Sequence, residues 1–338
     1  MKIKIVAQHK HHIQLEPLLR PKVLSILQDH KIHIVESRPD VILYHTYKAG
    51  PEHKRVLQEK NIPILILERI ASARILSRSY IGQDNVKGIL KSTIYRDLNI
   101  ENTPYMVDHE NYPDRDFKNN YHTKLIFDSF NKDYIYLTPQ PALDDSELKK
   151  VKLWYNFCSY EMMHKFMNHK KSTSNKRKVD ISFYGTTTYG PRSLAITTHR
   201  QRCIKKLKKI NGNVDQYSGR KPKDQYISSL INSKIGISPW GLGEKCYRDF
   251  EAIFSGSILV KPDTSFVLDW MDTYNLKNKL YIPCEIDFSD LQEKVDYIKT
   301  NWIELDEFRL NAFKYCKTFS EDEKIALHII SVLNKCII

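Results

Sequence analysis

Short apolar runs, separated by stretches of helical periodicity, fill most of the first half of the chain. Three of these runs have the length of a buried strand and lie at residues 2–7, 41–44 and 63–67. Helices are expected at 15–29, 52–59 and 146–155, with weaker strand patterns at 86–90 and 124–127. Because strands that alternate with helices form parallel sheets covered on both faces, the pattern predicts a first α/β unit over residues 1–150.

The same alternation begins again at Val179, after a polar and basic run at 169–178. Strand patterns lie at 179–184, 214–217, 235–237, 258–260 and 280–283. Helical patterns lie at 193–209, 224–232, 244–254, 265–272, 289–301, 305–315 and 321–334. We therefore expect a linker at 151–178, a second Rossmann-like domain at 179–320, and a C-terminal helix at 321–338 that could pack back on the first domain. Two α/β domains of this kind favour a binding site in the cleft between them.

The stretch from Ser233 to Pro262 carries the densest candidate chemistry. It reads as a strand, a loop with two glycines, a helix and a second strand, which is how α/β domains present phosphate-bearing ligands. If the helix spans 244–254, then Glu244, Arg248 and Glu251 share one face. The Arg248 guanidinium suits a diphosphate, and the Glu251 carboxylate can accept hydrogen bonds from ribose hydroxyls. An ordinary surface pair of Arg248 with Glu244 is the alternative.

A second candidate is the turn after the strand at 179–184, where Gly185 precedes Thr186. A glycine there lets a ligand approach the backbone, and free N–H groups and hydroxyls suit a diphosphate. A tight strand-to-helix turn without a ligand is the alternative. No GxGxxG follows a strand anywhere in the chain, so the dinucleotide fingerprint is not present.

The segment from Gly241 to Val260, with its glycine loop, Arg-x-x-Glu-Ala and small-residue turn, resembles the donor-binding segment of GT-B glycosyltransferases. It is most similar to the exostosin-like and group-1-like families, and residues 261–310 resemble the protein O-glucosyltransferase type. The resemblance implies two Rossmann-like domains facing a central cleft, a UDP- or GDP-sugar donor, and no metal or bound cofactor. It also implies a set of donor-binding residues, namely Gly185, Thr186, Ser238, Trp240, Gly241, Gly243, Glu244, Tyr247, Arg248 and Glu251.

One departure from the group-1 pattern concerns the two glutamates. Glu244 and Glu251 are seven positions apart, whereas retaining group-1 enzymes have two glutamates eight positions apart. The resemblance therefore leaves the stereochemical outcome open.

A transfer with inversion needs a general base from the first domain. His45 and Glu68 are the best candidates, since each directly follows an apolar strand. His9, His11 and His12 also follow a strand, but neighbouring side chains on an extended segment point to opposite faces. Asp114 and Asp116 match a metal-binding DxD pattern, yet they lie in a polar loop, so we expect no metal there.

The chain has 338 residues and a formal net charge of +13, which indicates anionic partners. We expect a cytoplasmic enzyme with a carbohydrate or glycolipid acceptor, and the charge would allow peripheral contact with an anionic membrane. We expect no nucleic acid partner. Two alternatives stay open: a basic nucleic-acid-binding protein, and another twin-Rossmann sugar-nucleotide enzyme such as an epimerase. The six cysteines include no CxxC pair, so reduced structural thiols are expected.

Overall fold

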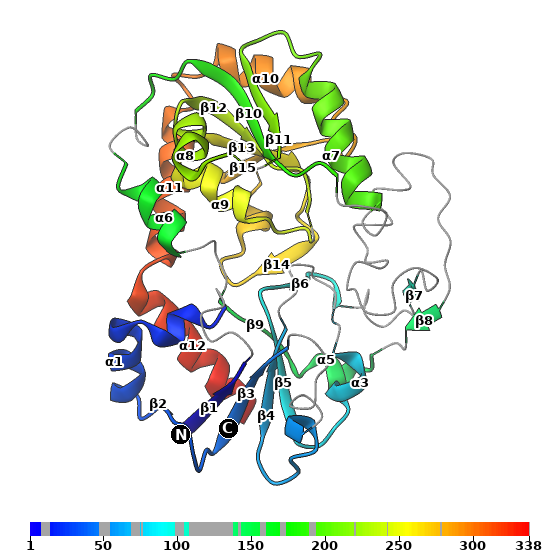
Figure 1. Cartoon of the computed structure of the whole chain (residues 1–338), viewed down its shortest axis with the longest axis vertical. Helices are drawn as coiled ribbons and strands as arrows, with labels where there is room; N and C mark the ends of the chain where they lie inside the picture. Colours follow the sequence, from blue (N-terminus) through cyan, green and yellow to red (C-terminus); the bar gives the residue numbers. More distant parts are fainter. Residues whose placement is uncertain are drawn as a thin grey trace.

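The protein folds into two α/β domains that lie one above the other in Figure 1. The computed structural model describes residues 1–7, 14–46, 55–68, 75, 77–98, 105–107, 138–140, 143–155, 160–169, 174–188, 194–219, 221–241, 243–277 and 279–337. The five cysteines within these ranges are all free thiols.

The first domain is built on a six-stranded parallel sheet with the strand order β2-β1-β3-β4-β5-β9. Its strands are β1 (Lys2–Val6), β2 (His33–Ile34), β3 (Val41–His45), β4 (Ile64–Leu67), β5 (Val86–Lys91) and β9 (Val151–Leu153). The central strands β3 and β4 are buried along their whole length, as their continuous apolar sequences require. The sequence predicts a linker at residues 151–178, but its first three residues, Val151 to Leu153, pair with β5 and form the edge strand β9.

The second domain has a five-stranded parallel sheet with the order β11-β10-β12-β13-β15. Its strands are β10 (Val179–Gly185), β11 (Val214–Ser218), β12 (Ser233–Ile237), β13 (Ile258–Pro262) and β15 (Tyr281–Cys284). The chain leaves β10 toward β11 and leaves β12 toward β13, in opposite directions, which in doubly wound sheets creates a crevice outside the carboxyl ends of the two strands. Two parallel doubly wound sheets confirm the predicted pair of Rossmann-like domains.

Helices cover both faces of each sheet. In the first domain they are α1 (Pro21–Asp29), α3 (Arg78–Ile81) and α5 (Asp145–Leu148), with a 3-10 turn η1 (Glu16–Leu19). In the second they are α6 (Tyr160–Met167), α7 (Leu194–Leu207), α8 (Lys223–Ile231), α9 (Tyr247–Phe254), α10 (Leu291–Thr300) and α11 (Asp306–Phe319), with a 3-10 turn η4 (Thr273–Leu276). Buried residues of α7 and α10 pack on one face of the second sheet, and those of α8, α9 and α11 pack on the other.

The last helix, α12 (Asp322–Ile337), leaves the second domain and packs against α1 of the first (Figure 1). Arg20 at the start of α1 forms an ion pair with Asp322, with 2.9 Å between Nη1 and Oδ1. Farther along α12, His328 Nε2 donates a hydrogen bond to the Leu153 carbonyl at 3.1 Å. Both chain ends therefore lie in the first domain.

A short antiparallel pair of strands connects the two domains, between β6 (Thr93–Tyr95) and β14 (Val267–Asp269). The sequence prediction of a helix at 265–272 is wrong, because Val267 and Asp269 are buried as alternate residues of β14. The predicted helix at 146–155 is likewise shorter, ending at Leu148 before β9 begins. Another antiparallel pair joins β7 (Tyr105–Val107) to β8 (Thr138–Gln140).

Candidate functional site

The crevice between β10 and β12 brings together the two segments that the sequence singled out. Gly185 ends β10 and is followed by Thr186, while Ser238 follows β12. Ligands of doubly wound sheets bind at this kind of strand reversal. The residues from Ser238 to Cys246, of which Leu242 lies outside the described ranges, form what we call the glycine loop.

Arg248 reaches from α9 across the crevice to the end of β10. Its Nε and Nη2 atoms donate hydrogen bonds to the Tyr184 carbonyl at 3.1 and 2.6 Å. A Cβ atom on Gly185 would collide with the Arg248 guanidinium, so a larger residue at this position would displace that end of the arginine side chain. The close contact between this glycine and arginine fixes the cation beside the Gly185–Thr186 turn.

A second cation, Arg200, contacts the same turn. It is buried on α7, and it donates from Nη1 to the Thr186 carbonyl at 2.9 Å and from Nε to the Trp240 carbonyl at 3.2 Å. A Cβ atom on Gly241 would lie 2.7 Å from Arg200 Nη2. Arg200 is not among the residues predicted from the sequence, although it lies on the same buried face of α7 as Ile196, Cys203 and Leu207.

The glycine loop rests on the buried carboxylate of Asp249, the third residue of α9. This carboxylate accepts hydrogen bonds from Ser238 Oγ at 2.5 Å, from Cys246 N at 3.1 Å and from Tyr274 OH at 2.7 Å. Buried Lys261 on β13 forms an ion pair with Asp249 at 2.7 Å. The network fixes both ends of the loop and the amino end of α9.

Glu244 does not share a helical face with Arg248 and Glu251, and that prediction is wrong. Cys246 has extended backbone angles and caps α9, so the helix begins at Tyr247. Glu244 lies in the glycine loop, fully buried, and its carbonyl accepts a hydrogen bond from Lys261 Nζ at 2.9 Å. Of the other predicted donor residues, Trp240 and Gly243 are buried and Tyr247 is 46% exposed.

Glu251 is partly buried one turn after Arg248, and its Oε2 accepts a hydrogen bond from Tyr226 on α8. Burial raises the pKa of the Glu251 carboxyl above its usual range, and the bond from Tyr226 and the charge of Arg248 oppose that rise. The Tyr226 ring packs edge-on to Tyr184, with ring centroids 5.9 Å apart. Through Tyr226, Glu251 thus lies near the end of β10 that Arg200 and Arg248 contact.

In the first domain, His45 ends β3 and is buried. Its Nε2 lies 3.2 Å from Gln14 Oε1, and Gln14 Nε2 donates to the Glu68 carbonyl at 2.9 Å. Since an amide oxygen can only accept, His45 donates from Nε2, and when the ring is neutral its lone pair is on Nδ1.

Glu68, directly after β4, forms a buried ion pair with Lys91 on β5, with 2.8 Å between Oε2 and Nζ. Its Oε1 accepts a hydrogen bond from Ser77 N at 2.6 Å. Burial favours the neutral acid, but the charge and hydrogen bond of Lys91 outweigh it and hold the pKa of Glu68 below its usual range. Glu68 is therefore ionised at neutral pH, and each of its carboxylate oxygens accepts a hydrogen bond.

Several predicted features lie outside the described residues: His9, His11, His12, and the Asp114 and Asp116 pair. Among the described residues, no group of three or more His, Cys, Asp or Glu side chains is arranged to hold a metal. Within the same ranges, no helix combines the length and apolar character needed to cross a membrane.

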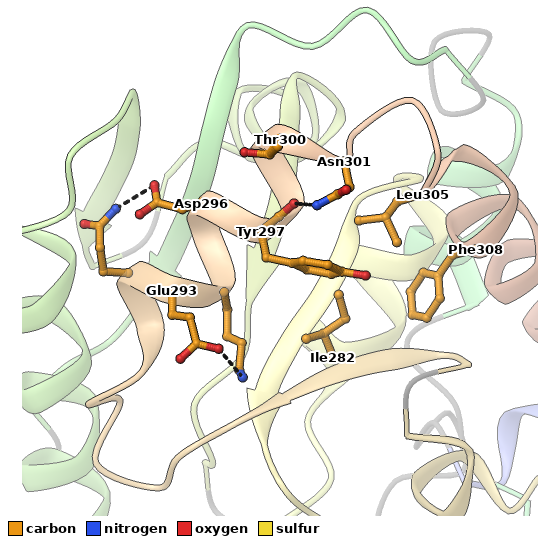
Figure 2. A pocket seen from close by; sticks show the side chains of 10 residues that line it. Ile282, Glu293, Asp296, Tyr297, Thr300, Asn301, Leu305 and Phe308 are labelled. Atoms are coloured by element: carbon orange, nitrogen blue, oxygen red, sulfur yellow. Dashed lines mark hydrogen bonds and ion pairs between the residues drawn. The ribbon is translucent and has the colours of Figure 1, made fainter.

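A depression of about 1080 Å³ lies on the outer side of α10, away from the crevice (Figure 2). Tyr297 projects toward Leu305 and Phe308 there, and Glu293 and Asp296 also line the depression. Figure 1 shows α10 at the end of the second domain remote from the first. This depression contains none of the predicted site residues.

The whole chain is similar in fold to solved glycosyltransferase structures. One is a glycosyltransferase from Rickettsia africae ESF-5, with a TM-score of 0.52 and 9% identity, matched over 99% of this chain and 98% of that chain. Another is an alpha-glucosyltransferase in complex with UDP, with a TM-score of 0.51 and 11% identity, matched over 98% and 99%.

An alpha-glucosyltransferase in complex with UDP-glucose and DNA containing an abasic site matches with a TM-score of 0.50 and 10% identity, over 98% of each chain. No family model matches the sequence, and the search of curated proteins returns no match. At these identities the likeness shows the fold, which is the GT-B arrangement that the sequence predicts. The finer exostosin-like resemblance stays a prediction.

Proposed function

We propose that this chain is a glycosyltransferase that moves a sugar from a UDP- or GDP-sugar to a hydroxyl group of a carbohydrate or glycolipid. The observation that carries the proposal is the pair of guanidinium groups, Arg200 and Arg248, held on main-chain carbonyls around the Gly185–Thr186 turn. Two cations fixed this close to one strand end favour a doubly charged anion such as a diphosphate.

In the proposed reaction, the acceptor oxygen forms a bond to the anomeric carbon while the bond from that carbon to the diphosphate oxygen breaks. The leaving diphosphate gains negative charge, which Arg248, Arg200 and the amino end of α9 stabilise. These fixed groups would replace a metal ion in the charge balance, so we propose a metal-independent enzyme. Transfer that persists in excess EDTA would support this point.

Glu251 is proposed to bind the ribose. Among the described residues, Tyr226 is the one hydrogen-bond donor to its carboxylate, through Oε2. Its Oε1 can then accept from a ribose hydroxyl. The glycine loop, including Ser238, Trp240, Gly241, Gly243 and Glu244, would lie against the base or the sugar together with the exposed Tyr247.

The acceptor proton needs a base, for which we propose His45 through its Nδ1 atom. Glu68, the other sequence candidate, would have to take up a proton beside Lys91, which favours its ionised form. We therefore propose that the Glu68 main-chain carbonyl orients Gln14, which in turn holds His45, and that the Glu68 carboxylate does not accept the proton. Replacement of His45 by Gln should lower kcat with little change in donor affinity.

Calorimetry with UDP and GDP tests the donor site directly. Arg248→Ala should weaken binding of the favoured nucleotide and lower transfer from its labelled sugar by about 100-fold or more, the loss expected for a fixed donor to a developing charge. Arg202→Ala is the matched control, because Arg202 lies on the same helix as Arg200 but outside the proposed donor site. Its side chain is 45% exposed, and its Nη2 lies 3.8 Å from Asp287 Oδ2. Wild-type protein that binds neither nucleotide, or equal activity of the two variants, would contradict the proposal.

Nucleic acid is a second candidate acceptor, favoured by the net charge of +13 and by the likeness in fold to a DNA-bound alpha-glucosyltransferase. An acceptor panel of oligosaccharides, glycolipid in anionic vesicles, and duplex DNA with hydroxymethylated bases would separate the two. Transfer to DNA that falls steeply with salt would favour the second candidate. Isomerised sugar nucleotide without any acceptor would indicate an epimerase instead.

A further inference from the structure

Residues 264–269, which we call the bridge segment, form hydrogen bonds to the first domain although they belong to the second. Within this segment β14 pairs with β6, with Asp269 opposite Thr93 and Val267 opposite Tyr95. The pairing continues past β6, where Arg96 N donates to the Phe266 carbonyl at 2.8 Å. The position of the bridge segment is therefore set by the first domain as well as the second.

The bridge segment also holds the glycine loop near both of its ends. Near the first end, Trp240 Nε1 donates to Thr264 Oγ1 at 3.0 Å, and the Trp240 ring packs edge-on to Phe266 at 5.7 Å. Near the second end, Lys245 Nζ lies 3.2 Å from Asp269 Oδ2. The loop that presents Gly241 and Cys246 to the crevice is thus attached to a strand that is paired with the other domain.

The Lys245–Asp269 pair is the attachment that costs most to break, because both side chains are almost fully removed from water, at 3% and 0% exposure. Asp269 is held in turn by Thr273, which donates from N at 2.7 Å and from Oγ1 at 3.0 Å. Separating the pair would leave a buried charge without its partner, which strongly destabilises the fold. Lys245 is therefore expected to follow Asp269 when the bridge segment moves.

We propose that Lys245 and Asp269 are positioning residues, which place the glycine loop and the start of α9 relative to the first domain. Lys245 directly precedes Cys246, the cap of α9, and Arg248 follows within the first turn. A shift of Lys245 therefore moves the guanidinium that contacts the Tyr184 carbonyl. This inference rests on the proposed function, since it makes the binding of a nucleoside diphosphate depend on how the first domain is docked.

Nucleotide affinity tests the pair against a matched control. Asp269→Asn should weaken binding of UDP or GDP, whichever the wild type prefers, by about tenfold, which corresponds to about 1.4 kcal/mol. Asp272→Asn is the control, because it removes a half-exposed ion pair between the domains, from Arg96 to Asp272, that does not touch the glycine loop. Equal affinity in the two variants would overturn the inference.

A double variant separates positioning from ordinary stability. Lys245→Met with Asp269→Asn removes both buried charges and keeps an amide oxygen that can accept from Thr273, so thermal stability should recover relative to Asp269→Asn alone. If the pair positions the loop, donor affinity stays about tenfold weaker, and KM for the donor stays raised. Recovery of both thermal stability and donor affinity would show that the pair only stabilises the fold, and it would overturn the inference.

Hydrogen exchange without nucleotide keeps the test independent of the proposed function. In Asp269→Asn, amides of the glycine loop and the first turn of α9 should exchange faster than in Asp272→Asn. Unchanged exchange there overturns the positioning role even if the protein binds UDP. Faster exchange in a protein that binds neither UDP nor GDP would support the link and reject the glycosyltransferase proposal.

Discussion

The charged side chains at the carboxyl ends of the two sheets are held by different kinds of partner. At the first sheet, Glu68 is matched by Lys91 within 2.8 Å, so the pair is neutral and fully buried. At the second sheet, Arg200 and Arg248 hydrogen-bond to main-chain carbonyl oxygens, which fix the guanidinium groups. Two domains of the same architecture thus differ in what holds the charged side chain at the strand ends, a carboxylate in the first and main-chain carbonyls in the second.

The neutral pair offers the sharpest test of this difference. Lys91→Met should lower the free energy of unfolding by about 3–5 kcal/mol, because it leaves the Glu68 carboxylate buried without its cation. Denaturant unfolding measures the loss. Adding Glu68→Gln to the same chain should restore most of it, and a single variant within about 0.5 kcal/mol of the wild type would show that the pair carries little stability.

At the second sheet, Gly185→Ala should act on binding more than on folding. The new Cβ would displace the Arg248 guanidinium, and we expect UDP or GDP affinity to fall by about 10- to 100-fold, or about 1.4–2.7 kcal/mol. Gly212→Ala is the control, since its Cβ would meet only the side-chain ends of Asp180 and Lys299. Nucleotide affinity that is equal in both variants would separate Gly185 from the donor site.

A smaller effect is expected at the junction between the domains, where His328 is packed against Trp270 with ring centroids 4.8 Å apart. Burial lowers the pKa of His328 from 6.5 to about 4, opposed by its bond to the Leu153 carbonyl and assisted by the charge of Lys335. The unfolded chain then binds more protons, so stability falls as the pH drops from 6.5 toward 4.

At about pH 5.5 the loss due to His328 should be near 1.4 kcal/mol, the equivalent of one pH unit. Denaturant unfolding at pH 7 and 5.5 measures it. His328→Leu should remove this part of the pH dependence, whereas His33→Gln, on the exposed side of β2, should keep it. Equal slopes in the two variants would assign the acid sensitivity to other groups.

The sequence predicts the sheet strands well because most of them are continuous apolar runs of the right length. It fails at β14, where Phe266, Val267 and Leu268 satisfy a helical pattern as well as a strand pattern. The deciding contact is with Thr93–Tyr95, about 170 positions earlier, and no local pattern contains it. Distance along the chain, rather than composition, explains this error.

Within the candidate site, residues in local sequence motifs were predicted, whereas residues whose role depends on distant contacts or on backbone conformation were not. Arg248 and Gly185 belong to local motifs, and the structure brings them into contact. Arg200 lies in a helix with many basic residues, so its sequence context does not distinguish it from the exposed ones. It nevertheless occupies a buried position on the same face as Ile196 and Cys203. Glu244 was assigned to the helix because spacing alone cannot show that Cys246 is an extended cap.

The return of α12 to the first domain has a consequence for how this chain folds during synthesis. Ile325, Ile329 and Leu333 of α12 belong to the same core as Val23 and Leu27 of α1. A ribosome that has made the first sheet has therefore not yet made the helix that covers one of its faces. The first domain to emerge is therefore the last to be completed, and its sheet stays prone to aggregation until α12 has been made and has packed against it.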